Sequence, residues 1–190
     1  LENPLTEAGR SLALTLGRRL PQSALRGYAS PAHRCIETAS LLIEGANTQH
    51  HLQLGEPTAR PVEALGVFYA LDQIRMWKGL RQAEGLSGYV AQWVYGGVDS
   101  AIMMAPTLAA RFILDVLLAK LDSPGPQQQS PSIDICVTHD MTILMMRHVL
   151  GLEPVERGPV NYLDGLLLYR EGERVMLASS LGGRVVLDPS

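Results

Sequence analysis

Apolar residues recur at helical and at strand spacing in separate stretches of the chain. Residues 6–20 place apolar side chains at intervals of three and four, which predicts an amphipathic helix capped by Thr6. Residues 27–30 are typical of a short strand, and Pro31 is positioned to begin a second helix over about residues 31–43. The expected core face of this helix is Ile36, Ala39, Leu42 and Ile43. Helix, strand and helix in succession indicate an α/β protein.

The clearest strand runs from Ile133 to Val137 and leads directly into Thr138, His139 and Asp140. It is short, largely apolar and β-branched, as an interior strand should be. Residues 141–150 are apolar on nearly every side, and Gly151 is placed to end a helix there. Ligands collect beyond the carboxyl ends of strands in open α/β sheets, and the start of the next helix attracts anions. His139 and Asp140 are therefore candidate functional residues.

The pattern of apolar residues in the middle of the chain predicts helices that form an insertion. Residues 72–82 and 89–94 carry helical patterns with Trp77 and Trp93 as large apolar anchors, so we expect a helical insertion over about residues 72–104. The remaining expectations are a helix over 106–121, a flexible turn-rich stretch over 123–131, and an antiparallel hairpin of residues 165–169 and 174–178 around residues 171–173.

Length and charge narrow the class of protein. With 190 residues, 46% of them apolar, the chain is expected to form a single domain over residues 1–190. The net charge is -3 and the cations form no basic run, so we expect no nucleic-acid partner. The apolar stretch 101–119 is interrupted by Pro106, Arg111 and Asp115, so we expect no membrane span. No pattern indicates a compartment or an oligomeric state.

A second candidate site lies where residues 30–39 turn from a strand end into a helix. Arg34 falls in the first helical turn, where its planar fork and the free N–H groups of the helix start can hold phosphoryl oxygens. The structural alternative is that Arg34 pairs with Glu37 or lies in solvent. For His139 and Asp140 the corresponding alternative is a packed histidine and a helix N-cap.

These segments together resemble the histidine phosphatase superfamily, which contains phosphoglycerate mutases and acid phosphatases. The resemblance rests, in order, on Pro4-Leu5-Thr6-Glu7-Ala8-Gly9-Arg10, on Tyr28-Ala29-Ser30-Pro31-Ala32-His33-Arg34 with Glu37-Thr38-Ala39, and on Val137-Thr138-His139-Asp140. It implies that Arg34 clamps phosphate, that His139 is the second pocket histidine, and that Asp140 is the general acid. If the mutase-like arrangement applies instead, the candidate acid is Glu63.

The chain departs from the family at the nucleophile. The family carries it in an Arg-His-Gly motif upstream of the helix that here follows Thr6, and this sequence contains no such motif. His33 precedes Arg34 and does not replace that histidine by position. Because a lost central strand would leave its neighbours with unpaired backbone groups, we expect the sequence to be an N-terminally incomplete version of a full enzyme.

The expected activity is metal-independent phosphomonoester hydrolysis through a phosphohistidine, with a small phosphorylated substrate and no cofactor. The expected fold is a three-layer α/β/α sandwich with a mostly parallel central sheet, in which residues 28–30 and 133–138 are neighbouring interior strands. His50 and His51 are expected to be exposed in a polar loop and not to bind metal. The alternatives are a pseudophosphatase that binds a phosphorylated ligand and an unrelated serine hydrolase, which the absence of a Gly-x-Ser-x-Gly elbow disfavours.

Overall fold

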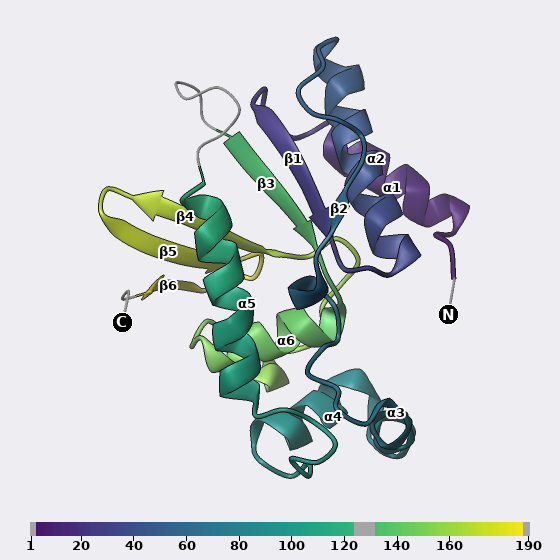
Figure 1. Ribbon diagram of the computed structural model, residues 1–190, viewed down its shortest axis with the longest axis vertical. Coiled ribbons are helices and arrows are strands. Elements are labelled where there is room, and N and C mark those ends of the chain that lie inside the picture. The colour runs from purple at the N-terminus through teal and green to yellow at the C-terminus, as the bar shows by residue number, and fades with distance from the viewer. Residues whose placement is uncertain (1–2, 124–131, 188–190) are drawn as a thin grey trace. The chain divides into compact units, whose positions relative to one another are not determined.

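The computed structural model of the chain describes residues 3–123 and 132–187 (Figure 1). The chain forms two compact units. Unit 1 comprises residues 1–66 and 122–139, and unit 2 comprises residues 67–121 and 140–190. Two such units can belong to one domain, so the single domain expected over residues 1–190 stays a prediction. The turn-rich stretch expected at 123–131 lies, apart from residue 123, outside the described residues.

Unit 1 is built on a parallel sheet. Strand β1 (Ala24–Ala29) pairs in parallel with β2 (Arg60–Pro61) on one side and with β3 (Ser132–Val137) on the other. Helix α2 (His33–His50) packs on β1 and β3, and α1 (Glu7–Gly17) packs on α2. The expected α/β class with a parallel sheet is confirmed, and so is the pairing of the two strands predicted as neighbours.

The side chains of β1 and β3 alternate between an apolar and a charged face. Leu25 is buried in a cluster with Ile43 of α2 and with Ile133 and Ile135 of β3. The charged residues alternate with these apolar residues along the two strands. Arg26 of β1 donates two hydrogen bonds to Asp134 of β3, from Nε at 2.5 Å and from Nη2 at 2.8 Å. Because successive side chains in a strand point to opposite faces, this ion pair lies on the face away from α2.

Helix α1 begins as the sequence predicts and ends earlier. The Thr6 hydroxyl accepts a hydrogen bond from Gly9 N at 3.1 Å, which confirms Thr6 as the N-cap. The helix stops at Gly17, three residues before the expected end at Leu20. Gly17 lies against the backbone of α2, where a side chain would overlap the Leu42 carbonyl oxygen. The close approach of the two helices therefore requires glycine at this position.

Helix α2 begins and ends at other residues than the sequence predicts. Pro31 is not its first residue: Ala32 is the N-cap, and the helix runs from His33 to His50 instead of ending near Ile43. Beyond Ile43, Gly45 lies against the backbone of α1 and Ala46 is buried. His50 consequently lies in the last helical turn, not in a loop, with Nε2 2.9 Å from the Leu20 carbonyl oxygen.

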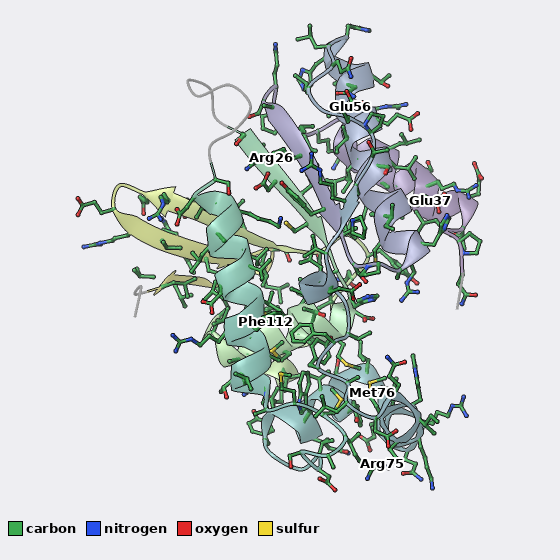
Figure 2. All side chains as sticks on the ribbon, in the orientation of Figure 1. Arg26, Glu37, Glu56, Arg75, Met76 and Phe112 are labelled. Atoms are coloured by element: carbon green, nitrogen blue, oxygen red, sulfur yellow. The ribbon has the colours of Figure 1, made fainter. Side chains whose placement is uncertain are left out.

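Unit 2 contains the helices expected in the middle of the chain. Its helices are α3 (Gln73–Gln82), α4 (Gly85–Val94), α5 (Pro106–Leu121), α6 (Asp140–Val149) and the 3-10 turn η2 (Val155–Arg157). Trp93 is buried in its core, stacked on Tyr69 with ring centroids 4.9 Å apart. Trp77 is 48% exposed, so the prediction that it anchors the core is wrong. Met76, labelled in Figure 2, is the residue of α3 that is buried instead.

The end of unit 2 is an antiparallel sheet. The predicted hairpin is confirmed as β4 (Leu166–Glu171) and β5 (Arg174–Ser179), joined by a turn at Gly172 with φ 63°. A further strand, β6 (Arg184–Leu187), pairs with β5 and was not predicted. No helix among the described residues is long and apolar enough to cross a bilayer.

Candidate functional site

The candidate site forms where β1 and β3 end side by side. Ala29 and Val137 are partners in the parallel register, and Ser30 N donates to the Val137 carbonyl oxygen at 2.8 Å. The two chains therefore leave the sheet together, with Ser30 followed by α2 and Thr138 followed by His139. This is the edge of a parallel sheet at which ligands bind in open α/β folds.

Arg34 and His139 meet at this edge, as the sequence predicts. Arg34 Nη2 lies 3.2 Å from His139 Nδ1, although the two residues are 105 positions apart in the chain. Arg34 is exposed and His139 is half-buried, so the contact is open to solvent from the side of the arginine. A guanidinium and an imidazole in contact at a strand end suit the binding of an oxyanion.

Glu37 does not pair with Arg34, which was one of the two structural alternatives; the other, exposure to solvent, agrees with the exposed side chain of Arg34. Glu37 Oε1 instead accepts a hydrogen bond from Arg10 Nε at 2.6 Å, and its Oε2 accepts one from Leu5 N at 3.2 Å (Figure 2 labels Glu37). Partial burial works to raise the pKa of Glu37, but these two hydrogen bonds outweigh it and lower that pKa. Glu37 therefore joins the start of α1 to α2, and Arg34 is left facing His139.

The start of α2 carries no side chain that would compete with a bound anion for the free N–H groups of the helix. Ala32, its N-cap, makes no side-chain hydrogen bond to the helix, and no acidic residue lies in the first turn. The orphan N–H groups of a helix start favour an anion, and a positive Arg34 in the same turn adds to that preference. The electrostatics of the start of α2 therefore favour an anion, and phosphate binding stays a prediction.

Ser30 is the residue of this edge that sequence reasoning missed. Its side chain is almost fully buried, at 2% exposure, and its Oγ lies 2.8 Å from His139 Nε2. The sequence placed Ser30 only as the last residue of a strand. A serine at a strand end before proline is common in turns, so nothing in the local pattern distinguishes a serine that holds a histidine.

Neighbouring groups hold the backbone before His139. The Thr138 hydroxyl donates to the Leu65 carbonyl oxygen at 2.6 Å, and the Cys35 thiol contacts the Thr138 carbonyl oxygen at 3.8 Å. Leu65 belongs to the 3-10 turn η1 (Glu63–Leu65), which follows β2. The segment that carries His139 is therefore attached both to α2 and to η1.

Glu63, the alternative acid, is exposed on this same turn. Val62, directly before it, donates from N to the Ala29 carbonyl oxygen at 2.8 Å, so η1 begins beside the end of β1. Gly66, which follows η1, packs near Ser30: a side chain there would come within 3.6 Å of Ser30 Oγ. The structure thus places the backbone of Glu63 next to the candidate site, and its role as acid stays a prediction.

Asp140 follows His139 in the chain and is the first residue of α6 in unit 2. It is exposed, and its Oδ1 accepts a hydrogen bond from Met141 N at 2.8 Å. Within unit 2, burial, with a smaller contribution from the charge of Asp140, raises the pKa of Tyr69, which stays a neutral phenol hydrogen-bonded to Thr142 at 2.8 Å. The role of Asp140 as general acid also stays a prediction.

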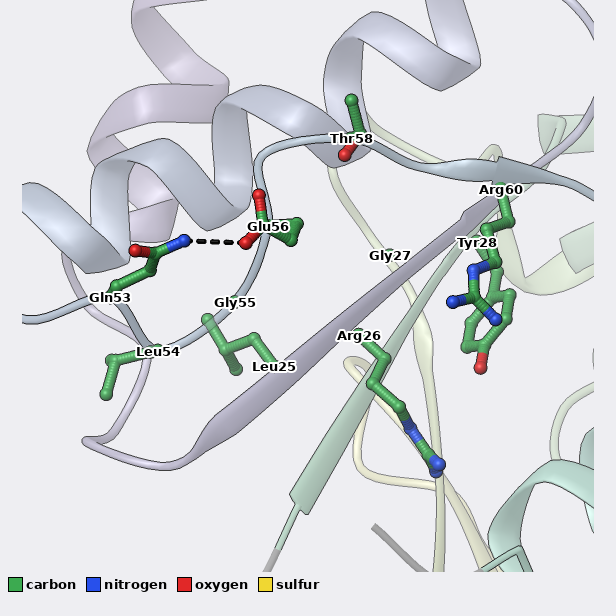
Figure 3. Close-up of a pocket in the computed structure, with 10 residues that line it drawn as sticks. All are labelled: Leu25, Arg26, Gly27, Tyr28, Gln53, Leu54, Gly55, Glu56, Thr58 and Arg60. Carbon is green, nitrogen blue, oxygen red and sulfur yellow. Dashed lines mark hydrogen bonds between the residues drawn. The ribbon is translucent and has the colours of Figure 1, made fainter. Parts of the chain in front are cut away.

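The described residues contain no group of three or more His, Cys, Asp or Glu side chains placed to hold a metal ion. A cavity of about 410 Å³ lies elsewhere in unit 1, between β1 residues 25–28 and the segment 53–60 (Figure 3). Figure 3 shows Gln53 and Glu56 on one side of it, joined by a 2.6 Å hydrogen bond, and Arg60 beside Tyr28. Neither Arg34 nor His139 lines this cavity.

Comparison with known proteins gives one match. The model of the histidine phosphatase superfamily (branch 1) matches residues 1–63, which include the helices α1 and α2, Arg34 and Glu63. No curated protein and no solved structure matches the chain. The family match supports a phosphatase-like or mutase-like function in general. The resemblance to the histidine phosphatase superfamily is therefore confirmed, and the confirmation rests on residues 1–63.

Proposed function

We propose that this protein binds a phosphomonoester through Arg34 and His139 and hydrolyses it through a phosphohistidine. The observation that carries the proposal is the 3.2 Å contact between Arg34 Nη2 and His139 Nδ1, at the carboxyl ends of two parallel strands. A phosphoryl group needs several donors arranged around its oxygens. The guanidinium of Arg34 and the uncapped start of α2 would supply such donors, beside the imidazole of His139.

The chemistry follows from these parts. A nucleophilic histidine, to which we assign no residue of this sequence, forms a bond from a neutral imidazole nitrogen to phosphorus as the ester P–O bond breaks, while Arg34 holds the charge on the other phosphoryl oxygens and His139 lies beside it. Asp140 gives its proton to the leaving oxygen. Its carboxylate then takes a proton from the water that cleaves the phosphoimidazole, which releases phosphate and restores the free histidine. Glu63 takes this role in the mutase-like alternative, and neither route requires a metal ion.

A second candidate function is a pseudophosphatase that binds a phosphorylated ligand without cleaving it. The sequence contains no Arg-His-Gly motif, and in this chain we assign no residue as nucleophile. The contact between Arg34 and His139 does not depend on that residue, so oxyanion binding alone is compatible with the same geometry. The two functions share a binding site and differ in turnover.

Hydrolysis of 4-nitrophenyl phosphate in the presence of EDTA separates the two functions. The enzyme should release nitrophenol, should form a phosphoprotein that is stable in alkali and labile in acid, and should lose roughly a hundredfold or more of kcat on Arg34→Ala or His139→Ala. Phosphate binding without turnover or phosphoprotein would support the pseudophosphatase. Absence of both binding and turnover would contradict both functions.

A further inference from the structure

The Ser30 hydroxyl connects three parts of unit 1. Its backbone N–H extends the pairing of β1 with β3 through the 2.8 Å bond to the Val137 carbonyl oxygen. Its Oγ accepts a hydrogen bond from Ala32 N at 3.4 Å, at the start of α2. The same Oγ lies 2.8 Å from His139 Nε2. Because both the backbone N–H and the buried side-chain oxygen of Ser30 make these contacts, its side chain has little freedom to move.

These contacts determine which nitrogen of His139 carries the proton. A guanidinium has only N–H donors, so Nδ1, which faces Arg34 Nη2 at 3.2 Å, must be the acceptor. The proton of the neutral imidazole then resides on Nε2 and is donated to Ser30 Oγ. The opposite tautomer would place an N–H of His139 against an N–H of Arg34.

We propose that Ser30 is a positioning residue that holds the ring of His139 in the orientation in which Nδ1 meets Arg34, so that Arg34 selects the Nε2–H tautomer. The hydrogen bond on one imidazole nitrogen generally fixes the protonation of the other, and this is how a protein selects the nitrogen that meets a ligand.

The tautomer has a consequence for the ligand, which rests on the function proposed above. An oxyanion that binds Arg34 would displace its Nη2 from Nδ1, and Nδ1 would then accept a hydrogen bond from the ligand. A phosphomonoester monoanion carries a proton on one phosphoryl oxygen and can donate it to Nδ1. Sulfate has no such proton near neutral pH. The site should therefore prefer inorganic phosphate to sulfate, and this preference should depend on Ser30.

Long-range proton–nitrogen NMR of the protein labelled with ¹⁵N in its histidines tests the tautomer directly. The spectrum is recorded above the ordinary histidine pKa of about 6.5, and His139→Asn identifies the signals of His139 among the five histidines. We expect a protonated Nε2 and an unprotonated Nδ1 in the wild type and in Ser30→Thr, which keeps the hydroxyl. Ser30→Ala should give a mixture of both tautomers.

Calorimetric titration with phosphate and with sulfate gives a second measurement. The wild type and Ser30→Thr should bind phosphate several-fold more tightly than sulfate, and Ser30→Ala should bind phosphate more weakly and lose most of the difference. Thermal unfolding shows whether each variant is folded. If Ser30→Ala does not fold, the proposal is tested by the tautomer of His139 in the wild-type spectrum.

An Nδ1–H tautomer or a doubly protonated His139 in the wild type would overturn the proposal. So would a folded Ser30→Ala variant with the same tautomer and the same ratio of phosphate to sulfate affinity as the wild type. The NMR measurement is independent of catalysis. A protein with the expected tautomer and no hydrolytic activity would refute the hydrolase proposed above and leave the role of Ser30 intact.

Discussion

At the scale of single residues, the proposed hydrolysis depends on which carboxyl group serves as the acid. As general acid, Asp140 is most needed when the leaving group is a poor one, so Asp140→Asn should lower turnover of an alkyl phosphate roughly a hundredfold or more and that of an activated aryl phosphate much less. The melting temperature should change little, because Asp140 is exposed and the side-chain oxygen of asparagine can also accept the hydrogen bond from Met141 N. Turnover of both substrates by the wild type and by Asp140→Asn measures this.

Glu63→Gln is the matched variant, since it also removes one carboxylate without changing its shape. Glu63 is exposed on η1, so this change should leave the fold intact. If Asp140→Asn retains full activity on alkyl phosphates while Glu63→Gln loses it, the acid is Glu63 and the mutase-like arrangement applies.

The residues of the candidate site differ in how well the sequence predicts them. Arg34 and His139 were found because each follows a strand at a place where chemistry is common, and the structure brings them into contact. The partner of Glu37 was not foreseen, because the Arg10 that binds it lies on another helix. Ser30 could not be identified at all, since its role depends on a contact over 109 positions of the chain.

At the scale of elements, the packing of α1 on α2 gives a prediction about glycine. Gly17→Ala should destabilise the fold by about 2 kcal/mol or more, because its new side chain would overlap the Leu42 carbonyl oxygen and force the helices apart. Gly9→Ala in the same helix is the control. Its side chain would meet neighbours at an ordinary 3.4 Å, so a gain in helix propensity of up to about 1 kcal/mol is expected.

Denaturant unfolding of the two alanine variants checks this prediction. The Gly17 variant should unfold at a lower denaturant concentration than the wild type, and the Gly9 variant at the same or a higher one. Equal midpoints for all three proteins would show that α1 does not approach α2 as closely as the structure indicates.

The connection between α1 and α2 should also depend on pH. The pKa of Glu37 is lowered in the folded state, so its stabilising contribution is present above its ordinary pKa of 4.5 and is lost as pH falls through the folded value. Glu37→Gln should therefore be less stable than the wild type at about pH 7, and the difference should shrink toward about pH 3.5. Melting temperatures of both proteins across this range measure it, and a difference that grows in acid would contradict the sign.

Element boundaries show where sequence periodicity stops being informative. Helix α2 continues to His50, beyond Ile43, its last large apolar residue, and Gly45 and Ala46 in the continuation are both buried. Small residues at a helix contact carry no periodic signal. Helix α5, in contrast, begins at a proline and carries large apolar residues along its whole length, and its observed bounds, Pro106–Leu121, are those predicted.

At the scale of the whole molecule, the α/β class and the parallel pairing of β1 with β3 could be predicted, because short apolar strands alternate with helices along the chain. The short strands β2 and β6 could not, since β2 has two exposed residues and β6 alternates too briefly to be recognised. Trp77 was misplaced because size and hydrophobicity alone do not show which face of a helix is buried. The division into two units depends on contacts that no local pattern contains.

The central claim, that Arg34 and His139 form an oxyanion site, is tested most directly by calorimetric titration with inorganic phosphate. Arg34→Ala should lose about 1.5 to 3 kcal/mol of binding free energy, the scale of a hydrogen bond to a charged group. Arg81→Ala, which removes an equally exposed arginine from α3 in unit 2, should bind phosphate as the wild type does. Equal phosphate affinity in the wild type and Arg34→Ala would contradict the account.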